Sequence, residues 1–313
     1  MVFKIIEIKK RLKKLKLTNF SVNTLQEAVL RKRKSYRTIC QNFEGKKVFF
    51  KCILQKERII RNRFLNEINF LKAVNKNPDY PLYKFVPKIL DYSTSRSFPY
   101  LIYKFIEGET RLSEDKFSVP EIKQIAHILH LIHSSPTEIF EFIPSTPLFG
   151  YSFLQKKFKF FLKNPLIEKS LKQKILTFVS RQKKILYNKK KTVRLTHGDF
   201  SESNLIFSKG TIKVIDWEHT HLRNPLYDVA DFWIKRRKHK IEQNTLISEY
   251  FKNIKEKEKF QILFKSAILE ICLRDLSLFQ KTLENLKKKK IARKIRKKEK
   301  EVKEYLEILK NTL

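Results

Sequence analysis

The sequence of 313 residues predicts an α+β protein with a small sheet-containing N-terminal part and a larger, mainly helical C-terminal part. Short runs rich in β-branched and aromatic residues, which favour strands, concentrate before residue 106. From residue 118 onward apolar residues recur at helical spacing, and residues 241–313 contain neither Gly nor Pro. We therefore expect a first lobe at 1–105 and a second at 106–313, in a chain long enough to bury a substantial core.

The N-terminal part begins with a basic amphipathic segment, residues 3–17, whose apolar positions predict a helix. This helix either packs on the first lobe or lies on a membrane surface. Strand-type runs follow at Leu25–Leu30, Tyr36–Asn42 and Val48–Leu54, with a turn at residues 44–45 between the last two.

Lys51 lies among bulky apolar residues of the last of these runs. Burying an unpaired ammonium group is costly, so a buried Lys51 needs an anionic partner. The next helical pattern supplies Glu67, beside an apolar stripe formed by Ile60, Phe64, Ile68 and Leu71. An outward-facing lysine on an alternating strand is the alternative, but we expect a Lys51–Glu67 ion pair.

Further elements follow in order along the chain. The runs at 88–92 and 100–108 predict the last strands of the first lobe and a connection to the second. A helix is expected at 118–134, with Pro120 in its first turn. Helical patterns at 151–190 lead to a short strand at 192–196.

The segment after this strand carries the most informative residues of the chain. His197 and Asp199 precede Asn204, and Asp216 follows Asn204 by twelve positions, directly after two apolar β-branched residues. Phosphoryl transfer from ATP uses such a set: one carboxylate orients the acceptor hydroxyl, while an amide and a second carboxylate hold magnesium against the phosphates.

The pattern HxDxxxxN followed by hxD resembles the catalytic core of the aminoglycoside phosphotransferase and choline kinase superfamily. The sequence IDWE at 215–218, followed by Asp228, is similar to the choline kinase branch in particular. The resemblance implies a two-lobed protein-kinase-like fold and a reaction in which Mg²⁺ and ATP are used to phosphorylate a hydroxyl of a small molecule.

The resemblance also implies roles for individual residues. Asp199 would be the catalytic carboxylate. Lys51 and Glu67 would position the ATP phosphates, and Tyr103 and Phe105 would lie at the hinge that binds adenine.

Asn204 and Asp216 would hold Mg²⁺, a hard ion that prefers oxygen ligands. His197 and Asp228 would support the catalytic loop. Glu218 is either a helper near the site or a salt-bridged surface residue.

Two features bear on how the phosphates and the acceptor are bound. Residues 28–37 lack the glycines with which kinases cover the phosphates, and instead carry five positive charges within residues 31–37. These charges either hold the phosphates or form a solvated turn. Only twelve positions separate Asp216 from Asp228, too few for a long activation loop, which favours a small acceptor over a protein.

The formal net charge is +37, which favours anionic partners. Compositional drift towards lysine explains the same charge without a partner.

The basic helical tail at 281–313, with thirteen basic and five acidic residues, is either a solvated helix or a contact for a polyanion or membrane surface. Because a cationic protein repels cations, we expect a neutral or anionic acceptor, although the likeness to choline kinases points to a cation.

The remaining composition narrows the functional classes. Cys40, Cys52 and Cys272 lack metal-site spacing and are expected to be reduced thiols. No apolar run approaches a bilayer span, so the sequence favours a cytoplasmic enzyme. The alternatives are a choline or ethanolamine kinase proper, and a catalytically idle kinase-like module that binds RNA or membrane.

Overall fold

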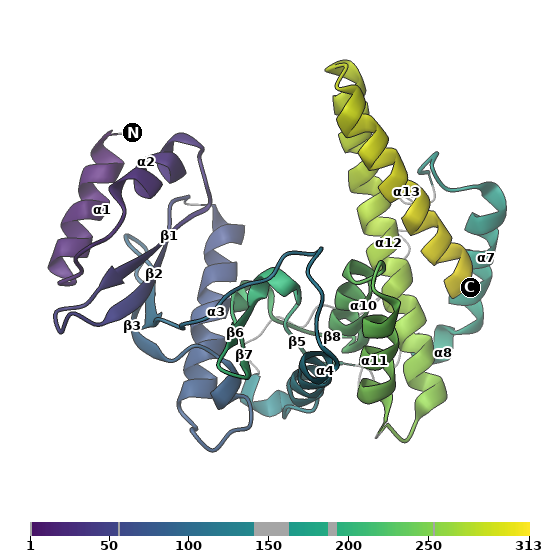
Figure 1. The fold of residues 1–313 in the computed structure, drawn as a ribbon, viewed down its shortest axis with the longest axis horizontal. Helices are drawn as coiled ribbons and strands as arrows, with labels where there is room; N and C mark the ends of the chain where they lie inside the picture. The colour runs from purple at the N-terminus through teal and green to yellow at the C-terminus, as the bar shows by residue number, and fades with distance from the viewer. Residues whose placement is uncertain (1, 56, 141–162, 187–192, 253) are drawn as a thin grey trace. The chain divides into compact units, whose positions relative to one another are not determined.

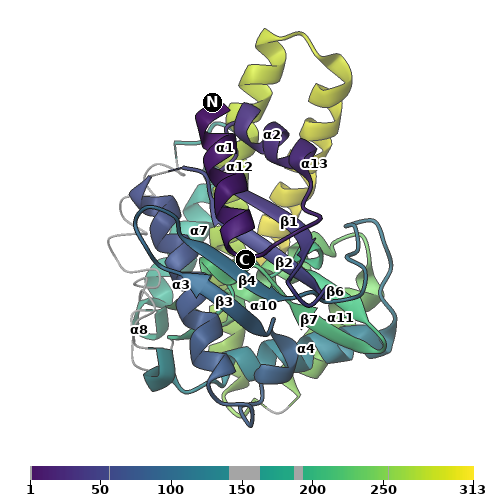
Figure 2. The ribbon, with the colours of Figure 1, turned by 90° about the vertical axis from the view of Figure 1, so that its left-hand side faces the viewer.

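The computed structural model describes residues 2–55, 57–140, 163–186, 193–252 and 254–313 (Figures 1 and 2). The chain forms two compact units. Unit 1 comprises Met1–Asp115, Glu138–Ile143 and Glu202–Thr220, and unit 2 comprises Lys116–Thr137, Pro144–Ser201 and His221–Leu313. The chain thus returns to unit 1 for the segment that carries Asn204 and Asp216.

Unit 1 is built on a four-stranded antiparallel sheet of order β1-β2-β4-β3. Its strands are β1 (Ser35–Gln41), β2 (Lys47–Ile53), β3 (Ile89–Ser93) and β4 (Tyr100–Lys104). The other elements of unit 1 are α1 (Val2–Lys14), α2 (Val22–Leu30), α3 (Arg58–Asn75), η1 (Tyr83–Phe85), η4 (Glu202–Asn204), β6 (Leu205–Ser208), β7 (Thr211–Val214) and η5 (Trp217–His219).

Alternation along the strands gives this sheet two different faces. On one face, Tyr36 of β1, Phe50 of β2 and Ile102 of β4 are buried against Leu12 of α1 and Leu25 of α2. Helices α1 and α2 lie beside β1 and β2 in both views (Figures 1 and 2). The basic N-terminal helix therefore packs on the sheet through its apolar side, which is one of the two alternatives that the sequence allowed.

The predicted strand at Leu25–Leu30 is wrong, because these residues belong to helix α2. The Ser21 side chain caps the helix by accepting a hydrogen bond from the Thr24 N–H (3.2 Å). Leu25, Ala28 and Val29 are then buried on one helical face at spacings of three and four residues. A short apolar run is ambiguous between strand and helix, and here the cap and the face that packs on the sheet decide for the helix.

Unit 2 is mainly helical. Its helices are α4 (Val119–His133), α7 (Lys169–Arg181), α8 (Lys183–Leu186), α10 (Leu226–Lys235), α11 (Lys240–Phe251), α12 (Lys257–Lys288) and α13 (Ala292–Thr312), and its strands are β5 (Arg194–Thr196) and β8 (His221–Arg223). The short helix η2 (Thr137–Phe140) begins at its boundary. Of the helical patterns predicted at 151–190, residues 151–162 and 187–190 lie outside the described residues.

The basic C-terminal segment 281–313 is not a separate tail. It comprises the last turns of α12 and the whole of α13, which lie side by side in Figure 1. Tyr305 of α13 is buried and its ring meets Phe279 at 5.1 Å, and Leu309 is fully buried. Arg237 Nε also pairs with Glu304 at 2.7 Å. Only the basic side of α13 is therefore solvated, and its apolar side belongs to the core of unit 2.

In the part of the chain that the structure describes, no helix is both long and apolar enough to cross a membrane.

Candidate active site

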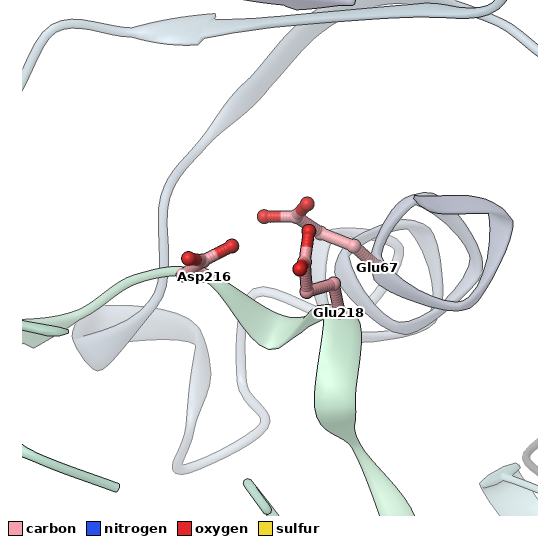
Figure 3. Close-up of side chains that lie close together, drawn as sticks. All are labelled: Glu67, Asp216 and Glu218. Atoms are coloured by element: carbon pink, nitrogen blue, oxygen red, sulfur yellow. The ribbon is translucent and has the colours of Figure 1, made fainter. Parts of the chain in front are cut away.

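A cluster of one ammonium and three carboxylates lies in unit 1. Lys51 Nζ is 2.6 Å from Glu67, 2.8 Å from Asp216 and 2.9 Å from Glu218. The three carboxylates converge from α3 and from the turn after β7 (Figure 3), and their oxygens lie within 4.8 Å of one another. The Lys51 side chain is only 2% exposed, so the ion pair with Glu67 that the sequence predicts is present and buried.

These carboxylates decide the charge state of the lysine. Burial disfavours the Lys51 ammonium, but the combined attraction of Glu67, Asp216 and Glu218 outweighs it and raises the pKa of Lys51 above its ordinary value. Lys51 is therefore a fixed positive charge at neutral pH, next to three groups that would otherwise repel one another.

Aromatic packing holds the turn that carries Asp216 and Glu218 against helix α3. Trp217, between them, is fully buried and stacks on Phe70 at a ring distance of 4.0 Å. Phe70 follows Glu67 by one helical turn, so both face the same side of α3. The indole N–H also donates to the Val214 carbonyl at 2.9 Å. Trp217 is thus a packing residue, and its packing places the two carboxylates beside Glu67.

The spacing of twelve between Asn204 and Asp216 has a structural cause. Strands β6 and β7 form a hairpin in which Leu205 pairs with Val214, and the turn at Lys209 and Gly210 has positive φ at both positions. Asn204 therefore lies at the open end of the hairpin, where its carbonyl accepts the Ile215 N–H at 3.0 Å. The hairpin returns the chain so that Asn204 is next to the residue that precedes Asp216.

Asp216 itself adopts a left-handed backbone conformation, with φ 65° and ψ 56°. Asp tolerates this region better than most residues with a side chain, but the conformation is still unfavourable. Such strain is found where the surrounding structure fixes a functional side chain, and here it redirects the chain from β7 into η5.

Two residues of this cluster were not assigned from the sequence. Glu218, whose role was left open, contacts Lys51 directly. Arg37 of β1 binds both oxygens of Asp216, at 3.1 and 3.3 Å. The turn predicted at residues 44–45 does not give this contact, because a hairpin centred on it would set Arg37 opposite Cys52. The observed register is centred on Glu44 and sets Arg37 opposite Lys51.

The same face of the sheet continues from charged to apolar residues. Arg37 and Lys51 are cross-strand partners, and the next row on this face is Ile39, Phe49 and Tyr103. Phe49 and Tyr103 stack at 4.8 Å, while Ile39 is 48% exposed. Tyr103 therefore lies one row from the charged cluster. We call this combined surface the site face.

Phe105, the second residue expected at the hinge, follows the end of β4 and is partly buried. The Lys47 ammonium lies 5.9 Å from the centre of its ring. Tyr103 and Phe105 are therefore both on or directly after β4, in unit 1.

His197, Asp199 and Asp228, which the sequence predicts to form and support a catalytic loop, lie in unit 2, where Asp228 organises the backbone. The Asp228 carboxylate is fully buried in the first turn of α10 and accepts the N–H groups of His197 (2.7 Å) and Gly198 (2.9 Å). Burial opposes its charge, but the hydrogen bond from His133 and the positive Arg223 hold the pKa of Asp228 below its ordinary value. Asp228 is therefore an ionised acceptor that fixes the loop from beneath.

Asp199 is presented outward by this fixed loop. Its side chain is 48% exposed, and its backbone N–H donates to Nδ1 of the buried His197 at 3.3 Å. Lys235 Nζ approaches the Asp199 carboxylate to 3.9 Å, and Arg223 donates to the Gly198 carbonyl at 3.1 Å. His197 thus orders the backbone of the loop, while the Asp199 carboxylate faces outward near Lys235, whose closer partner is Asp231 at 2.6 Å.

A buried hydrogen-bond chain extends behind Asp228. The Asp228 carboxylate only accepts, so Nε2 of His133, 3.4 Å away, must be the donor, and Nδ1 then accepts from the Tyr250 hydroxyl at 2.7 Å. This arrangement requires a neutral imidazole. Burial indeed lowers the pKa of His133 below its ordinary value.

We expect His133→Gln to reduce the loss of stability that the protein shows on mild acidification. The unfolded chain protonates His133 near its ordinary pKa of about 6.5, whereas the folded state resists protonation. The free energy of unfolding should therefore fall as the pH drops below about 6.5, by up to about 1.4 kcal/mol per pH unit from this group. Urea unfolding at pH 5–8 measures the effect. The exposed His127, replaced by Gln, is the control; equal pH dependence in parent and His133→Gln would contradict the assignment.

The donor atoms of unit 1 suit a hard divalent cation. Glu67, Asp216 and Glu218 each offer a carboxylate oxygen. Asn204, whose backbone carbonyl bonds to Ile215, also has an amide oxygen, which is a ligand type that such an ion binds. The carboxylates already contact the Lys51 ammonium and, at Asp216, the Arg37 guanidinium. A cation at Asp216 therefore fits the chemistry of the site, where it would compete with Arg37 and Lys51 for the carboxylate oxygens.

Solved structures with a similar fold span most of the chain. Aminoglycoside 2′-phosphotransferase-IIIa in complex with GDP shares 16% identity, with 90% of this chain and 89% of that chain covered and a TM-score of 0.58. The choline kinase LicA from Streptococcus pneumoniae shares 16% identity, covering 88% and 90%, with a TM-score of 0.54. A Plasmodium vivax ethanolamine kinase shares 20% identity, covering 78% and 73%, with a TM-score of 0.51. At these identities the similarities establish the fold, which is the two-lobed α+β kinase-like fold that the sequence predicted.

No curated protein matches the chain at a significant level. A family model does match, over residues 51–253, and this segment begins at Lys51 and includes Glu67, Asp199 and Asp216. The match covers more than half of the sequence, and the superfamily predicted from the motifs is thereby confirmed. The chain belongs to the phosphotransferase enzyme family that this model describes.

Proposed function

We propose that this phosphotransferase uses Mg²⁺ and ATP to phosphorylate a hydroxyl group of a small molecule. The observation that carries the proposal is the site face: a buried lysine fixed among three carboxylates, directly beside an apolar row. A nucleotide has the same two halves, an apolar base and a polyanionic phosphate chain.

Nucleotide binding is assigned chiefly to the first lobe at 1–105. The base would lie on the apolar row of Ile39, Phe49 and Tyr103, near Phe105, where stacking and burial favour a flat ring. The phosphates would meet Lys51, one row along the strands, or about 7 Å away. Glu67 would keep the Lys51 ammonium in position for them.

Mg²⁺ would be held by Asp216 and Asn204, which the β6–β7 hairpin brings to the same end of unit 1. When bound, the ion neutralises charge on the phosphates and orients them for transfer. Glu218 is a further candidate for this site, because its carboxylate shares Lys51 with Asp216.

The acceptor is assigned to the second lobe at 106–313, where Asp199 is the catalytic carboxylate. Its exposed side chain can accept or orient the proton of the acceptor hydroxyl. His197 and Gly198 would hold its backbone in place because Asp228 fixes both of their N–H groups. Between Asp216 and Asp228 the chain forms only η5, β8 and the start of α10, which leaves no segment for a peptide-binding platform.

Two other functions remain as alternatives. A choline or ethanolamine kinase is one, since structures of both enzymes share the fold. A catalytically idle module that binds RNA or membrane is the other, and the presence of Lys51, Asp199, Asn204 and Asp216 together argues against it. A pseudoenzyme under no selection for catalysis has no reason to keep all four.

We expect ADP release with a neutral or anionic acceptor, such as a sugar or a phosphorylated metabolite. The net charge is +37, so a polycation is repelled at long range. The measurement is a coupled assay of ADP release with Mg²⁺-ATP and a panel of hydroxyl compounds that includes choline, ethanolamine and kanamycin.

The same assay separates the alternatives. Saturable phosphorylation of choline or kanamycin, with sugars inert, would contradict the predicted acceptor but keep the reaction. Nucleotide binding without transfer to any acceptor would favour the idle module.

A further inference from the structure

The contact between Arg37 and Asp216 is unusual for a proposed metal ligand. The guanidinium binds both carboxylate oxygens of Asp216, at 3.1 and 3.3 Å, and approaches Glu218 at 3.8 Å. A bidentate guanidinium–carboxylate pair is among the stronger hydrogen-bonded arrangements in proteins. Asp216 therefore pairs with two protein cations, Lys51 and Arg37.

The position of Arg37 on the sheet is also unusual. Arg37 and Lys51 are directly opposite on β1 and β2, and like charges in this arrangement destabilise a strand pair. The nearby carboxylates compensate for this repulsion. A polyphosphate could neutralise these two neighbouring cations as well as the carboxylates do.

Arg37 and a metal ion compete for the same atoms. Mg²⁺ binds carboxylate oxygens at about 2.0–2.1 Å in a nearly octahedral arrangement and keeps several waters. A guanidinium across both oxygens of Asp216 occupies the space that these waters need. We therefore expect Mg²⁺ at Asp216 to displace Arg37 from at least one oxygen.

The Arg37 side chain has open space beside it into which it can move. Its side chain is 43% exposed, and its neighbours Lys34, Ser35 and Arg63 line a small cavity of about 70 Å³ together with Glu218. The other arginines of the basic run point to a different partner: Arg31 and Arg33 both pair with Glu27. Of this run, Arg37 is the member whose described contacts lie in the cluster around Lys51.

From this geometry we propose that Arg37 exchanges partners during nucleotide binding. In one arrangement Arg37 pairs with Asp216. In the other, Mg²⁺ binds Asp216 and Arg37 binds the phosphates, which supplies the contacts that a glycine-rich loop gives in other kinases. The exchange rests on the proposed function, and deepens it by naming the residue that replaces the missing loop. A guanidinium suits both positions because it binds carboxylate and phosphate oxygens with the same planar fork.

The exchange predicts effects of opposite sign on two ligands when Arg37 is replaced by Ala. Affinity for Mg²⁺-ADP and Mg²⁺-ATP should fall about 10- to 100-fold, the loss of a hydrogen-bonded charged contact. Affinity for a divalent cation alone should instead rise, because its competitor at Asp216 is gone. If Arg37 only supported the fold, its replacement would lower the affinity for both ligands.

The test uses the full chain and measures binding, not turnover. Nucleotide affinity is determined by isothermal titration calorimetry, and cation binding is followed with Mn²⁺ alone by electron paramagnetic resonance. Arg33→Ala is the matched control. It removes the same charge from the same basic run, but Arg33 pairs with Glu27 and not with Asp216. Arg37→Lys keeps the charge without the fork, and should bind nucleotide between the parent and Arg37→Ala.

The outcomes separate this inference from the proposed function. If the parent protein binds no nucleotide, the proposed function fails, and the exchange fails with it. If the parent binds nucleotide and Arg37→Ala binds it equally well, the exchange is wrong and the function stands. Weaker nucleotide binding with unchanged or weaker Mn²⁺ binding also overturns the exchange. If Arg37→Ala does not fold, the same two titrations on Arg37→Lys decide, with the same signs expected.

Discussion

Replacement of Asp199 by Asn should abolish measurable phosphoryl transfer while leaving Mg²⁺-nucleotide affinity within a few-fold of the parent. The amide can no longer accept the proton of the acceptor hydroxyl, and general base groups of this kind contribute about 10²–10⁴ in rate. Nucleotide and metal contacts are assigned to unit 1, whereas Asp199 lies in unit 2 with its side chain half exposed. The change should therefore act on turnover alone.

The measurements are the turnover number, calorimetric nucleotide affinity and thermal unfolding. Glu249→Gln serves as the control, because it also converts a carboxylate of unit 2 to an amide, at a site paired only peripherally with Lys123 at 3.4 Å. A tenfold fall in turnover number corresponds to an increase of about 1.4 kcal/mol in the activation free energy. A turnover number within about tenfold of the parent would show that Asp199 is not the catalytic carboxylate. A lower unfolding temperature would instead point to damage to the loop.

The parts of the site that depend on local spacing could be predicted from the sequence. The Asn204–Asp216 interval corresponds to one tight hairpin, and the strand lysine and helix glutamate, Lys51 and Glu67, meet as expected. The ion pair was expected because a buried ammonium needs an anion and because kinase-like folds pair a strand lysine with a helix glutamate. The hairpin was not predicted, and it explains the interval afterwards. The superfamily follows from the same residues, because its chemistry requires these residue types in this order.

What could not be predicted depends on contacts between distant segments. Arg37 and Asp216 are 179 positions apart, and their contact requires the register of β1 on β2 together with the packing of Trp217 on α3. Helix α2 was mistaken for a strand because its six apolar-rich residues fit either period until a sheet face covers them. The end of the chain was expected as a tail, since burial of Tyr305 depends on its partner Phe279 in α12.

The buried ion pair should show strong coupling in a double-mutant cycle of Lys51→Ala and Glu67→Ala. Removing Lys51 leaves the buried Glu67 carboxylate without its partner, which costs roughly 3–5 kcal/mol, and removing Glu67 as well relieves part of that cost. The two changes together should therefore destabilise the protein less than the sum of the single changes, by about 0.5–3 kcal/mol. Urea unfolding measures the free energies, and calorimetry measures the parallel loss of nucleotide affinity.

The structure adds an asymmetry to this cycle. Without Glu67, Lys51 still pairs with Asp216 and Glu218 at 2.8 and 2.9 Å, so its charge remains compensated. Without Lys51, three carboxylates within 4.8 Å of one another are left with Arg37 as their remaining cation in the described cluster. Lys51→Ala should thus cost more stability than Glu67→Ala and should weaken nucleotide binding more, with Glu67→Ala reproducing the loss only in part. Strictly additive free energies would mean that the two side chains do not meet in solution, and a larger cost for Glu67→Ala would mean that Asp216 and Glu218 do not share the lysine.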